Sequence, residues 1–329
     1  MNRYSAQAVD GQAAKQKVRV LLVDDHGDTV APTPAPGEPA QQPEFPALYQ
    51  AADRASHGGQ DLSVRLRAAQ LLLLLLAAFL GAVAIEVGGL RWGGLLASIA
   101  FAVAGLIEAM ILTVQPDKAW YQGRAVAESV KSLAWRYAVG GRPFSESNPA
   151  ARSADAVLAE RIQQILGDFE TIRILPLTGI VHEITDWMGR LRASSLADRK
   201  AAYQSDRIED QRLWYSKKAR WNESRSVAWS FALLIVQTLG VAGGVLYGTG
   251  KINFDLLGVM AAIAAAAVAW LQVKQHSTLT QSYAQAAHEL SMIRTLIPTI
   301  HSESDWARFV DNAETAISRE HTAWRAKRE

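Results

Sequence analysis

The sequence predicts an all-α, polytopic membrane protein with two transmembrane helical hairpins and long cytoplasmic helices that form coiled-coil-like bundles. The main observation is a set of four apolar runs, at about 68–87, 92–114, 226–249 and 256–273. Each run approaches or exceeds the roughly 18 to 20 residues that an α-helix needs to cross a hydrocarbon core of about 30 Å. A soluble bundle can bury one helix that is apolar on every side, but the remaining sequence is too short to enclose four.

Short connections at 88–91 and 250–255 join the runs in pairs, so each pair leaves the membrane on the side where it entered. The N-terminal tail, the middle of the chain and the C-terminal tail therefore share one compartment. Lysine and arginine are frequent in the flanks on that side, whereas the two connections carry only Arg91 and Lys251. The positive-inside rule makes the shared side cytoplasmic, so both termini are expected in the cytoplasm.

The composition narrows the classes of function. A formal net charge of +2 gives no strong attraction to nucleic acid, and none is expected as a partner. The chain has no cysteine, which excludes disulfides and thiolate metal sites. No motif of a hydrolase, a nucleotide-binding loop or a metalloprotease occurs, so we expect no enzyme, no catalytic residue and no cofactor. His182 and Glu183 lack further ligands at useful spacing, so no metal site is expected.

The order of elements indicates an internal duplication. In each half, a leading helix, two spans, an exit helix and a return helix follow one another. The predicted segments are a mostly disordered, proline-rich tail at 1–44, a first two-transmembrane module at 45–168, a connecting segment at 169–195 and a second two-transmembrane module at 196–329.

The helices outside the spans have recognisable ends. Pro116 is expected to interrupt the helix after the second span, which then resumes and ends at Gly140. The fourth span is expected to continue as one helix to about Ile297, just before a proline. The last helix should begin at Ser302, because Asp305 follows three residues later in a capping-box arrangement.

Two polar residues lie inside the apolar runs. Glu108 is near the cytoplasmic end of the second run, and Gln237 is near the middle of the third. Ionisable groups in a span usually face a protein interior or a water-filled path, since lipid exposure costs about 2.5 to 3.5 kcal/mol or more. Both residues are therefore candidates for lining a pore. Two alternatives stay open: Glu108 can reach the interface, and Gln237 can hydrogen-bond to a neighbouring helix.

Small residues favour close packing of the third and fourth spans. Gly240, Gly244 and Gly248 are four residues apart in the third run, and the fourth run is rich in alanine. Small side chains let two helix backbones approach closely. Four helices packed in this way enclose no wide aqueous lumen, so a pore requires several copies of the chain in a homo-oligomer.

The helix after the fourth span carries apolar residues that alternate by four and three positions, which is the spacing of a coiled-coil seam. The seam residues are Leu279, Tyr283, Ala286, Leu290, Ile293 and Ile297. This pattern predicts a packed partner helix, either within the same subunit or in a second subunit.

Several segments are specific enough to compare with a known family. They are 207–219 and 313–324 in the second half, and 45–56, 118–121 and 128–137 in the first half. The second-half segments resemble the start and the end of a SLATT module, the SMODS- and SLOG-associating two-transmembrane effector domain. The first-half segments resemble a second SLATT type, and the two modules together cover most of the chain.

The resemblance implies a membrane effector of a bacterial conflict or antiphage system, which forms an oligomeric pore in the inner membrane on receiving a nucleotide-type or partner signal. The implied partners are the lipid bilayer, further copies of the chain, and a nucleotide-synthesising or nucleotide-sensing protein. The family defines no catalytic residues, so none is transferred to this chain. The alternative function is a non-conducting, membrane-anchored scaffold that localises a cytoplasmic partner through the same helices.

Overall fold

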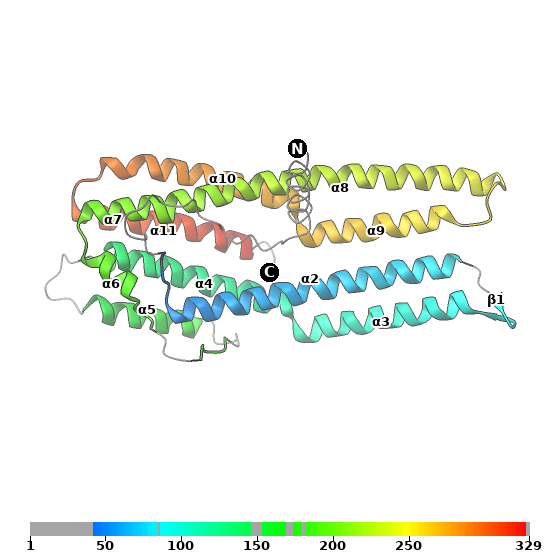
Figure 1. Cartoon of the computed structure of the whole chain (residues 1–329), viewed down its shortest axis with the longest axis horizontal. Helices are drawn as coiled ribbons and strands as arrows, with labels where there is room; N and C mark the ends of the chain where they lie inside the picture. Colours follow the sequence, from blue (N-terminus) through cyan, green and yellow to red (C-terminus); the bar gives the residue numbers. More distant parts are fainter. Residues whose placement is uncertain (1–41, 84–85, 146–152, 169–173, 179–181, 327–329) are drawn as a thin grey trace, which may run out of the picture. The chain divides into compact units, whose positions relative to one another are not determined.

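The computed structural model describes residues 42–83, 86–145, 153–168, 174–178 and 182–326, and most of this part is helical (Figure 1). The predicted proline-rich tail at 1–44 lies almost entirely outside the described residues. The elements up to Asp168 are α2 (Ala47–Ala82), β1 (Glu86–Val87), β2 (Leu90–Arg91), α3 (Trp92–Val114), α4 (Pro116–Val139) and α5 (Ala154–Asp168). The later elements are α6 (Asp186–Ala193), α7 (Leu196–Ala202), the π-helix η1 (Tyr203–Glu209), α8 (Asp210–Gly248), α9 (Leu256–Lys274), α10 (His276–Leu296), the 3₁₀-helix η2 (Ile297–Thr299) and α11 (Glu303–Ala326).

Four helical segments are long and apolar enough to cross a membrane: Ala47–Ala82, Trp92–Val139, Leu196–Gly248 and Leu256–Thr299. Many of their large apolar side chains point outward, and six of these are 64% to 70% exposed: Leu72, Phe101, Leu106, Leu112, Phe231 and Val241. Water would solvate such a surface poorly, so lipid or further protein has to cover it. The structure thus confirms the predicted class, an all-α polytopic membrane protein.

A two-residue β-ribbon joins the first two apolar helices. Glu86 pairs with Arg91 and Val87 with Leu90, and the intervening Gly88 and Gly89 have φ values of 63° and 80°. Two consecutive positive φ values suit a tight hairpin turn, and glycine adopts them without steric cost. The first span was expected to run to about residue 87, but the helix ends at Ala82 because the ribbon takes up the end of the apolar run.

Each second span meets its exit helix at a sharp elbow. Gln115 between α3 and α4 has φ 48°, and Gln275 between α9 and α10 has φ 50°. These are the positive-φ residues other than glycine in the described part of the chain, and such a conformation is costly for a residue with a Cβ. The break expected at Pro116 is confirmed, because a proline disfavours the helical conformation of the residue before it. The uninterrupted helix expected from the fourth span to Ile297 is wrong, because the chain turns at Gln275.

A polar contact to the leading helix lies directly beyond each elbow. Asp117 of α4 accepts hydrogen bonds from Ser63 and Arg67 of α2. In the second half, His276 Nδ1 of α10 lies 2.8 Å from Asn222 Oδ1 of α8, and both residues are buried. The two halves therefore stabilise corresponding elbows with different polar contacts, a carboxylate bound by two donors in the first half and a histidine–asparagine pair in the second. No proline marks Gln275, which explains why the sequence pattern did not reveal this second elbow.

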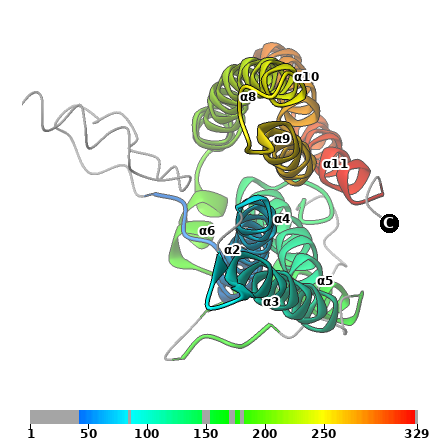
Figure 2. The same ribbon diagram turned by 90° about the vertical axis from the view of Figure 1, so that its right-hand side faces the viewer.

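The parts of the helices beyond the elbows form one packed bundle, here called the extramembrane bundle. Figure 2 looks along the helices and shows α2 to α6 gathered in one group and α8 to α11 in another. Contacts of α4 with α11, and of α2 with α9, join the two groups. The core of the bundle is fully buried and includes Trp135, Met188, Tyr203, Ile208, Trp306 and Val310. Ser302 Oγ accepts from the Asp305 N–H at 3.1 Å, which confirms the predicted start of the last helix.

Glycines set the distance between α2 and α4. A Cβ atom on Gly59 would lie 2.6 Å from the backbone nitrogen of Trp120, and one on Gly123 would lie 2.9 Å from that of Ser56. Both neighbours are backbone atoms, which cannot rotate away as a side chain does. The two helices can therefore lie this close only while both positions carry glycine.

We expect Gly59→Ala to lower the free energy of unfolding by about 1 to 3 kcal/mol, because the added methyl group overpacks the α2–α4 contact. Gly58 provides a matched control, since a Cβ there would meet nothing within 4 Å. Gly58→Ala should leave stability unchanged or raise it by up to about 1 kcal/mol through helix propensity. Thermal unfolding of the purified protein in detergent compares the two variants, and equal melting temperatures would contradict this account of the contact.

Candidate functional site in the extramembrane bundle

The polar candidates inside the spans occupy different environments. Glu108 on α3 is half-buried, and its carboxylate accepts a hydrogen bond from Gln70 Nε2 of α2 at 2.9 Å. Gln237 is exposed on the surface of α8. An amide at that position can satisfy its hydrogen bonds in lipid only by reaching a neighbouring helix. The pore-lining role of both residues stays a prediction.

The glycines of α8 differ in how closely α9 approaches them. A Cβ on Gly240 would lie 3.2 Å from Met260, and one on Gly244 would lie 3.2 Å from Leu257. Gly243 is the tightest of the α8 glycines, since a Cβ there would meet Leu256 at 2.8 Å, whereas Gly248 has nothing within 4 Å. Reading glycines only at intervals of four missed Gly243. Residues three or four positions apart lie on the same face of a helix, so the interval of three between Gly240 and Gly243 already indicated that Gly243 faces α9.

The six predicted seam residues, five on α10 and Ile297 in η2, are all buried or half-buried. Tyr283 lies edge-on to Trp214 of α8 with 5.5 Å between ring centroids, and Leu290 and Ile297 belong to the bundle core. The face that carries the seam therefore packs on helices of the same chain. Knobs-into-holes geometry and any role of these residues between subunits stay predictions.

The most polar point of the bundle core is a buried ion pair. Arg207 and Glu314 have side chains that are 1% and 0% exposed, and the Arg207 Nε and Nη2 atoms donate to the two carboxylate oxygens at 2.9 and 2.7 Å. Tyr203 donates its hydroxyl hydrogen to Glu314 Oε1 at 2.9 Å. This fork of two parallel hydrogen bonds is the strongest geometry that arginine and carboxylate can form. We call these three residues the buried clamp.

The electrostatics of the buried clamp favour the charged form of Arg207 and the neutral form of Tyr203. Burial disfavours the charged form of Arg207, but the Glu314 carboxylate outweighs burial, so the pKa of Arg207 is raised. Burial, reinforced by the Glu314 charge, raises the pKa of Tyr203 well above its usual value. The Nη1 atom of Arg207 has no hydrogen-bond partner in the described part of the chain, although it is buried.

A π-helix positions two members of the buried clamp. Tyr203 and Arg207 both lie in η1, four residues apart, and its wider turns are rare except as local bulges, which occur frequently at functional sites. Sequence reasoning missed the clamp, although Arg207 and Glu314 both lie in the segments that carry the SLATT resemblance. A charged residue in a helix that leads into a membrane is usually expected to be solvated. Only the tertiary packing shows that Arg207 is buried.

Side chains from the later helices close the end of α4, next to the clamp. Arg199 Nη1 and Trp306 Nε1 both donate to the backbone oxygen of Val139, at 3.1 and 2.8 Å. Arg192 donates to the backbone oxygen of Tyr137 at 2.9 Å. Cationic donors suit the negative end of a helix, whose last carbonyl groups lack partners within the helix. The last turn of α4 is therefore held by residues of α6, α7 and α11.

Aromatic side chains complete the join between the two groups of helices. Tyr203 lies edge-on to Trp306 and to Trp135, with ring centroids 5.6 and 5.8 Å apart, and Trp135 lies edge-on to Trp187 at 5.0 Å. Edge-to-face rings at these distances attract one another beyond their simple burial. In the described part of the chain, no three His, Cys, Asp or Glu residues gather in a way that could hold a metal ion. The aromatic rings thus join α4, α6, η1 and α11 in one packed cluster.

The fold and the clamp define a class of protein: a multi-pass α-helical membrane protein with an extramembrane bundle built from two similar modules. Comparison with family models gives the family. Residues 46–200 match SMODS and SLOG-associating 2TM effector domain 3, and residues 203–324 match SMODS and SLOG-associating 2TM effector domain 1. The chain belongs to the SLATT family and carries two such domains in tandem. A search of curated proteins and a search of solved structures gave no significant match.

We expect Arg207→Ala to lower the free energy of unfolding by about 3 to 5 kcal/mol, because it leaves the Glu314 carboxylate buried without its cation. Arg212→Ala is the matched control, since the side chains of Arg212 and Glu209, which pair between α8 and η1, are 25% and 26% exposed, so water reaches both. Ion pairs that water reaches contribute about 0 to 1 kcal/mol. Unfolding of both variants in detergent, followed by circular dichroism, tests the difference, and equal losses would show that the clamp is no stronger than a surface pair.

Tyr203→Phe should cost about 0.5 to 1.5 kcal/mol near neutral pH, the value of one hydrogen bond. It should also flatten the loss of stability in alkali. Because the pKa of Tyr203 is raised in the folded protein, its contribution is fully present below the ordinary tyrosine pKa of about 10 and is lost as the pH rises beyond it. Melting temperatures of both proteins between pH 8 and pH 11 measure this, and parallel profiles would contradict the assignment.

Proposed function

We propose that this protein is an oligomeric membrane effector that opens a pore in the bacterial inner membrane when a nucleotide-type or partner signal reaches its cytoplasmic bundle. One observation carries the proposal. The helices α2 and Leu196–Gly248 each run without a break from the extramembrane bundle into an apolar segment. A helix transmits a tilt or rotation along its whole length, so a change in the bundle has a direct mechanical route to the first and third spans.

The second spans and their exit helices do not form one continuous helix. The α3–α4 and α9–α10 connections turn at Gln115 and Gln275, where the backbone adopts a left-handed conformation. Elements that absorb large backbone changes are commonly a few residues at the ends of helices. Each module thus combines one stiff helix with one jointed helix. The buried clamp and the capped end of α4 hold both modules in a single arrangement, which we assign to the closed state.

Assembly of several copies supplies the lumen. The outward-facing apolar side chains and the exposed Gln237 leave α8 open to contact with another chain. A homo-oligomer would cover part of this surface and give Gln237 a hydrogen-bond partner. The frequent cationic residues beside the spans favour a cytoplasmic position of the bundle and both termini, under the positive-inside rule. A nucleotide-synthesising or nucleotide-sensing protein is the proposed source of the signal.

A second function is favoured by the environment of Glu108. Its carboxylate is already hydrogen-bonded to Gln70 within the same pair of helices, so it satisfies its own polarity without a pore. Such a protein would serve as a membrane-anchored scaffold that localises a cytoplasmic partner and conducts nothing. The two functions differ in whether the spans pass ions.

Membrane potential in bacteria that express the full-length chain separates the two functions. The natural signal is unidentified, so a mutation has to take its place. Glu314→Gln removes the charge that balances Arg207 and should disrupt the clamp. We therefore expect this variant to open the pore without a signal and to depolarise the cells. Arg308→Ala is the control, because among the described residues Arg308 pairs with Asp305 on the same helix, and both side chains are exposed. A potential-sensitive dye reports the result, after immunoblotting shows equal amounts of each protein in the membrane fraction.

Normal potential in cells that carry Glu314→Gln at wild-type level would overturn conduction and leave the scaffold. Where conduction is observed, Glu108→Ala should lower the preference for cations in current recordings from planar bilayers. Gln70→Ala keeps the Glu108 charge and should preserve that preference. Equal selectivity in both variants would show that Glu108 does not line the path.

A further inference from the structure

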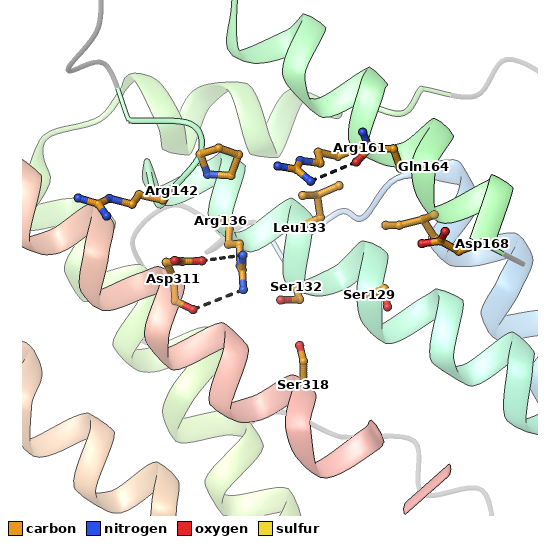
Figure 3. Close-up of a pocket in the computed structure, with 12 residues that line it drawn as sticks. Ser129, Ser132, Leu133, Arg136, Arg142, Arg161, Gln164, Asp168, Asp311 and Ser318 are labelled. Atoms are coloured by element: carbon orange, nitrogen blue, oxygen red, sulfur yellow. Dashed lines mark hydrogen bonds and ion pairs between the residues drawn. The ribbon is translucent and has the colours of Figure 1, made fainter. Parts of the chain in front are cut away.

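A polar cavity of about 470 Å³ lies among α4, α5 and α11, away from the spans (Figure 3). This volume falls within the range of roughly 300 to 1,000 Å³ that is typical of small-molecule sites and is larger than a single ion needs. Its walls come from both domains of the tandem pair, since α4 and α5 lie in the first family match and α11 lies in the second. The cavity plays no part in the buried clamp.

Two guanidinium groups face this cavity. In Figure 3, Arg161 of α5 extends toward α4, Arg136 of α4 reaches toward Asp311 of α11, and Arg142 extends away from both. Arg136 Nη1 pairs with Asp311 at 2.8 Å and Nη2 donates to Thr315 Oγ1 at 3.0 Å and to the Asp311 backbone oxygen at 3.4 Å, whereas Nε is buried without a hydrogen-bond partner in the described residues. Arg161 is exposed, and its Nη1 atom donates to Gln164 at 3.1 Å. A ligand can therefore accept from Arg161 directly, but it has to replace a contact of Arg136 with α11.

The other walls combine hydroxyl groups, apolar surface and the carboxylate of Asp168 at the end of α5. Ser129 and Ser132 lie one turn apart on α4, and Ser132 is only 5% exposed. Leu133 and Ile165 supply apolar surface to the lining. A bound molecule would thus meet both cationic donors and apolar surface in this cavity. This arrangement suits an organic molecule that carries an anionic group.

We propose that this cavity binds a small, water-soluble organic phosphate, whose phosphoryl group lies between Arg136 and Arg161. A phosphoryl group offers three acceptor oxygens on one centre, so it can accept from two guanidinium groups at once and from a serine hydroxyl. The organic part of the ligand rests on Leu133 and Ile165. This inference goes beyond the proposed function and does not depend on conduction, because binding is measured on the protein itself.

A phospholipid headgroup carries the same chemistry but lies too far away. Arg136 is about 20 residues beyond the elbow at Gln115, which corresponds to roughly 30 Å along α4 at 1.5 Å per residue. The ligand therefore comes from the aqueous phase. Its phosphoryl group would compete with Asp311 for Arg136, so binding would weaken one contact between the two domains.

The test measures binding to the full-length protein in nanodiscs by isothermal titration calorimetry, with inorganic pyrophosphate and adenosine monophosphate as probes and uncharged adenosine as control. We expect both anions to bind and adenosine not to. Arg161→Ala should weaken binding about tenfold, the value of one charge-assisted contact, without unfolding the protein, because Arg161 is exposed and its hydrogen bond within the described residues is a local one to Gln164. Asp311→Asn should strengthen binding, since it removes the competing carboxylate.

Arg308→Ala is the matched control for charge, because Arg308 lies on α11 one turn from Asp311 and does not line the cavity. Its affinity should equal that of the wild type. The proposal is overturned if neither anion binds at millimolar concentration, if adenosine binds equally well, or if Arg161→Ala and Arg308→Ala have the same effect. Nanodiscs of phosphatidylglycerol and of phosphatidylcholine should give the same affinity; competition by phosphatidylglycerol would make the lipid the occupant and overturn a soluble ligand.

Discussion

The buried ion pair of Arg207 and Glu314 constrains the whole extramembrane bundle. An unpaired charge in a protein interior costs several kcal/mol, so the two side chains cannot separate unless water or another partner replaces each of them. Arg207 lies on the helix that leads into the third span, and Glu314 lies on the last helix. Any change in the tilt of that leading helix must therefore either carry α11 with it or open the pair to solvent. The first choice moves the bundle as a unit, and the second disrupts it.

The same contact extends to the first domain through aromatic packing and through the end of α4. Tyr203, which donates to Glu314, also packs on Trp135 of α4, and Trp306 of α11 caps Val139. The carbonyl groups at the end of α4 depend on donors that come from the later helices. The clamp residues therefore contact side chains of both domains directly, so a change in the clamp affects both. Two domains that fold from similar elements behave in this way as one mechanical unit.

The sequence revealed the elements that follow from local chemistry. Runs of apolar residues long enough for a membrane predicted the spans, Pro116 predicted a break, and Ser302 with Asp305 predicted a helix start. Contacts between distant segments left no such pattern. The elbow at Gln275 follows from the packing of His276 on Asn222, more than fifty residues away, and the clamp joins residues 107 positions apart. Arg207 has the same local surroundings as its solvated neighbours in sequence, so burial alone distinguishes it.

The arrangement of polar groups in and near the membrane also bears on how opening could occur. In the present state Glu108 is satisfied by Gln70 of the adjacent helix, so a path that uses its charge has to separate α2 from α3 or rotate one against the other. The α2 helix is stiff along its length and is held to α4 by glycine contacts, whereas α3 meets α4 at a joint. Rotation of α3 about Gln115 therefore disturbs fewer contacts than movement of α2. Glu108, the residue proposed to line a path for ions, thus lies on the jointed helix of its pair, where a small backbone change can alter its direction most.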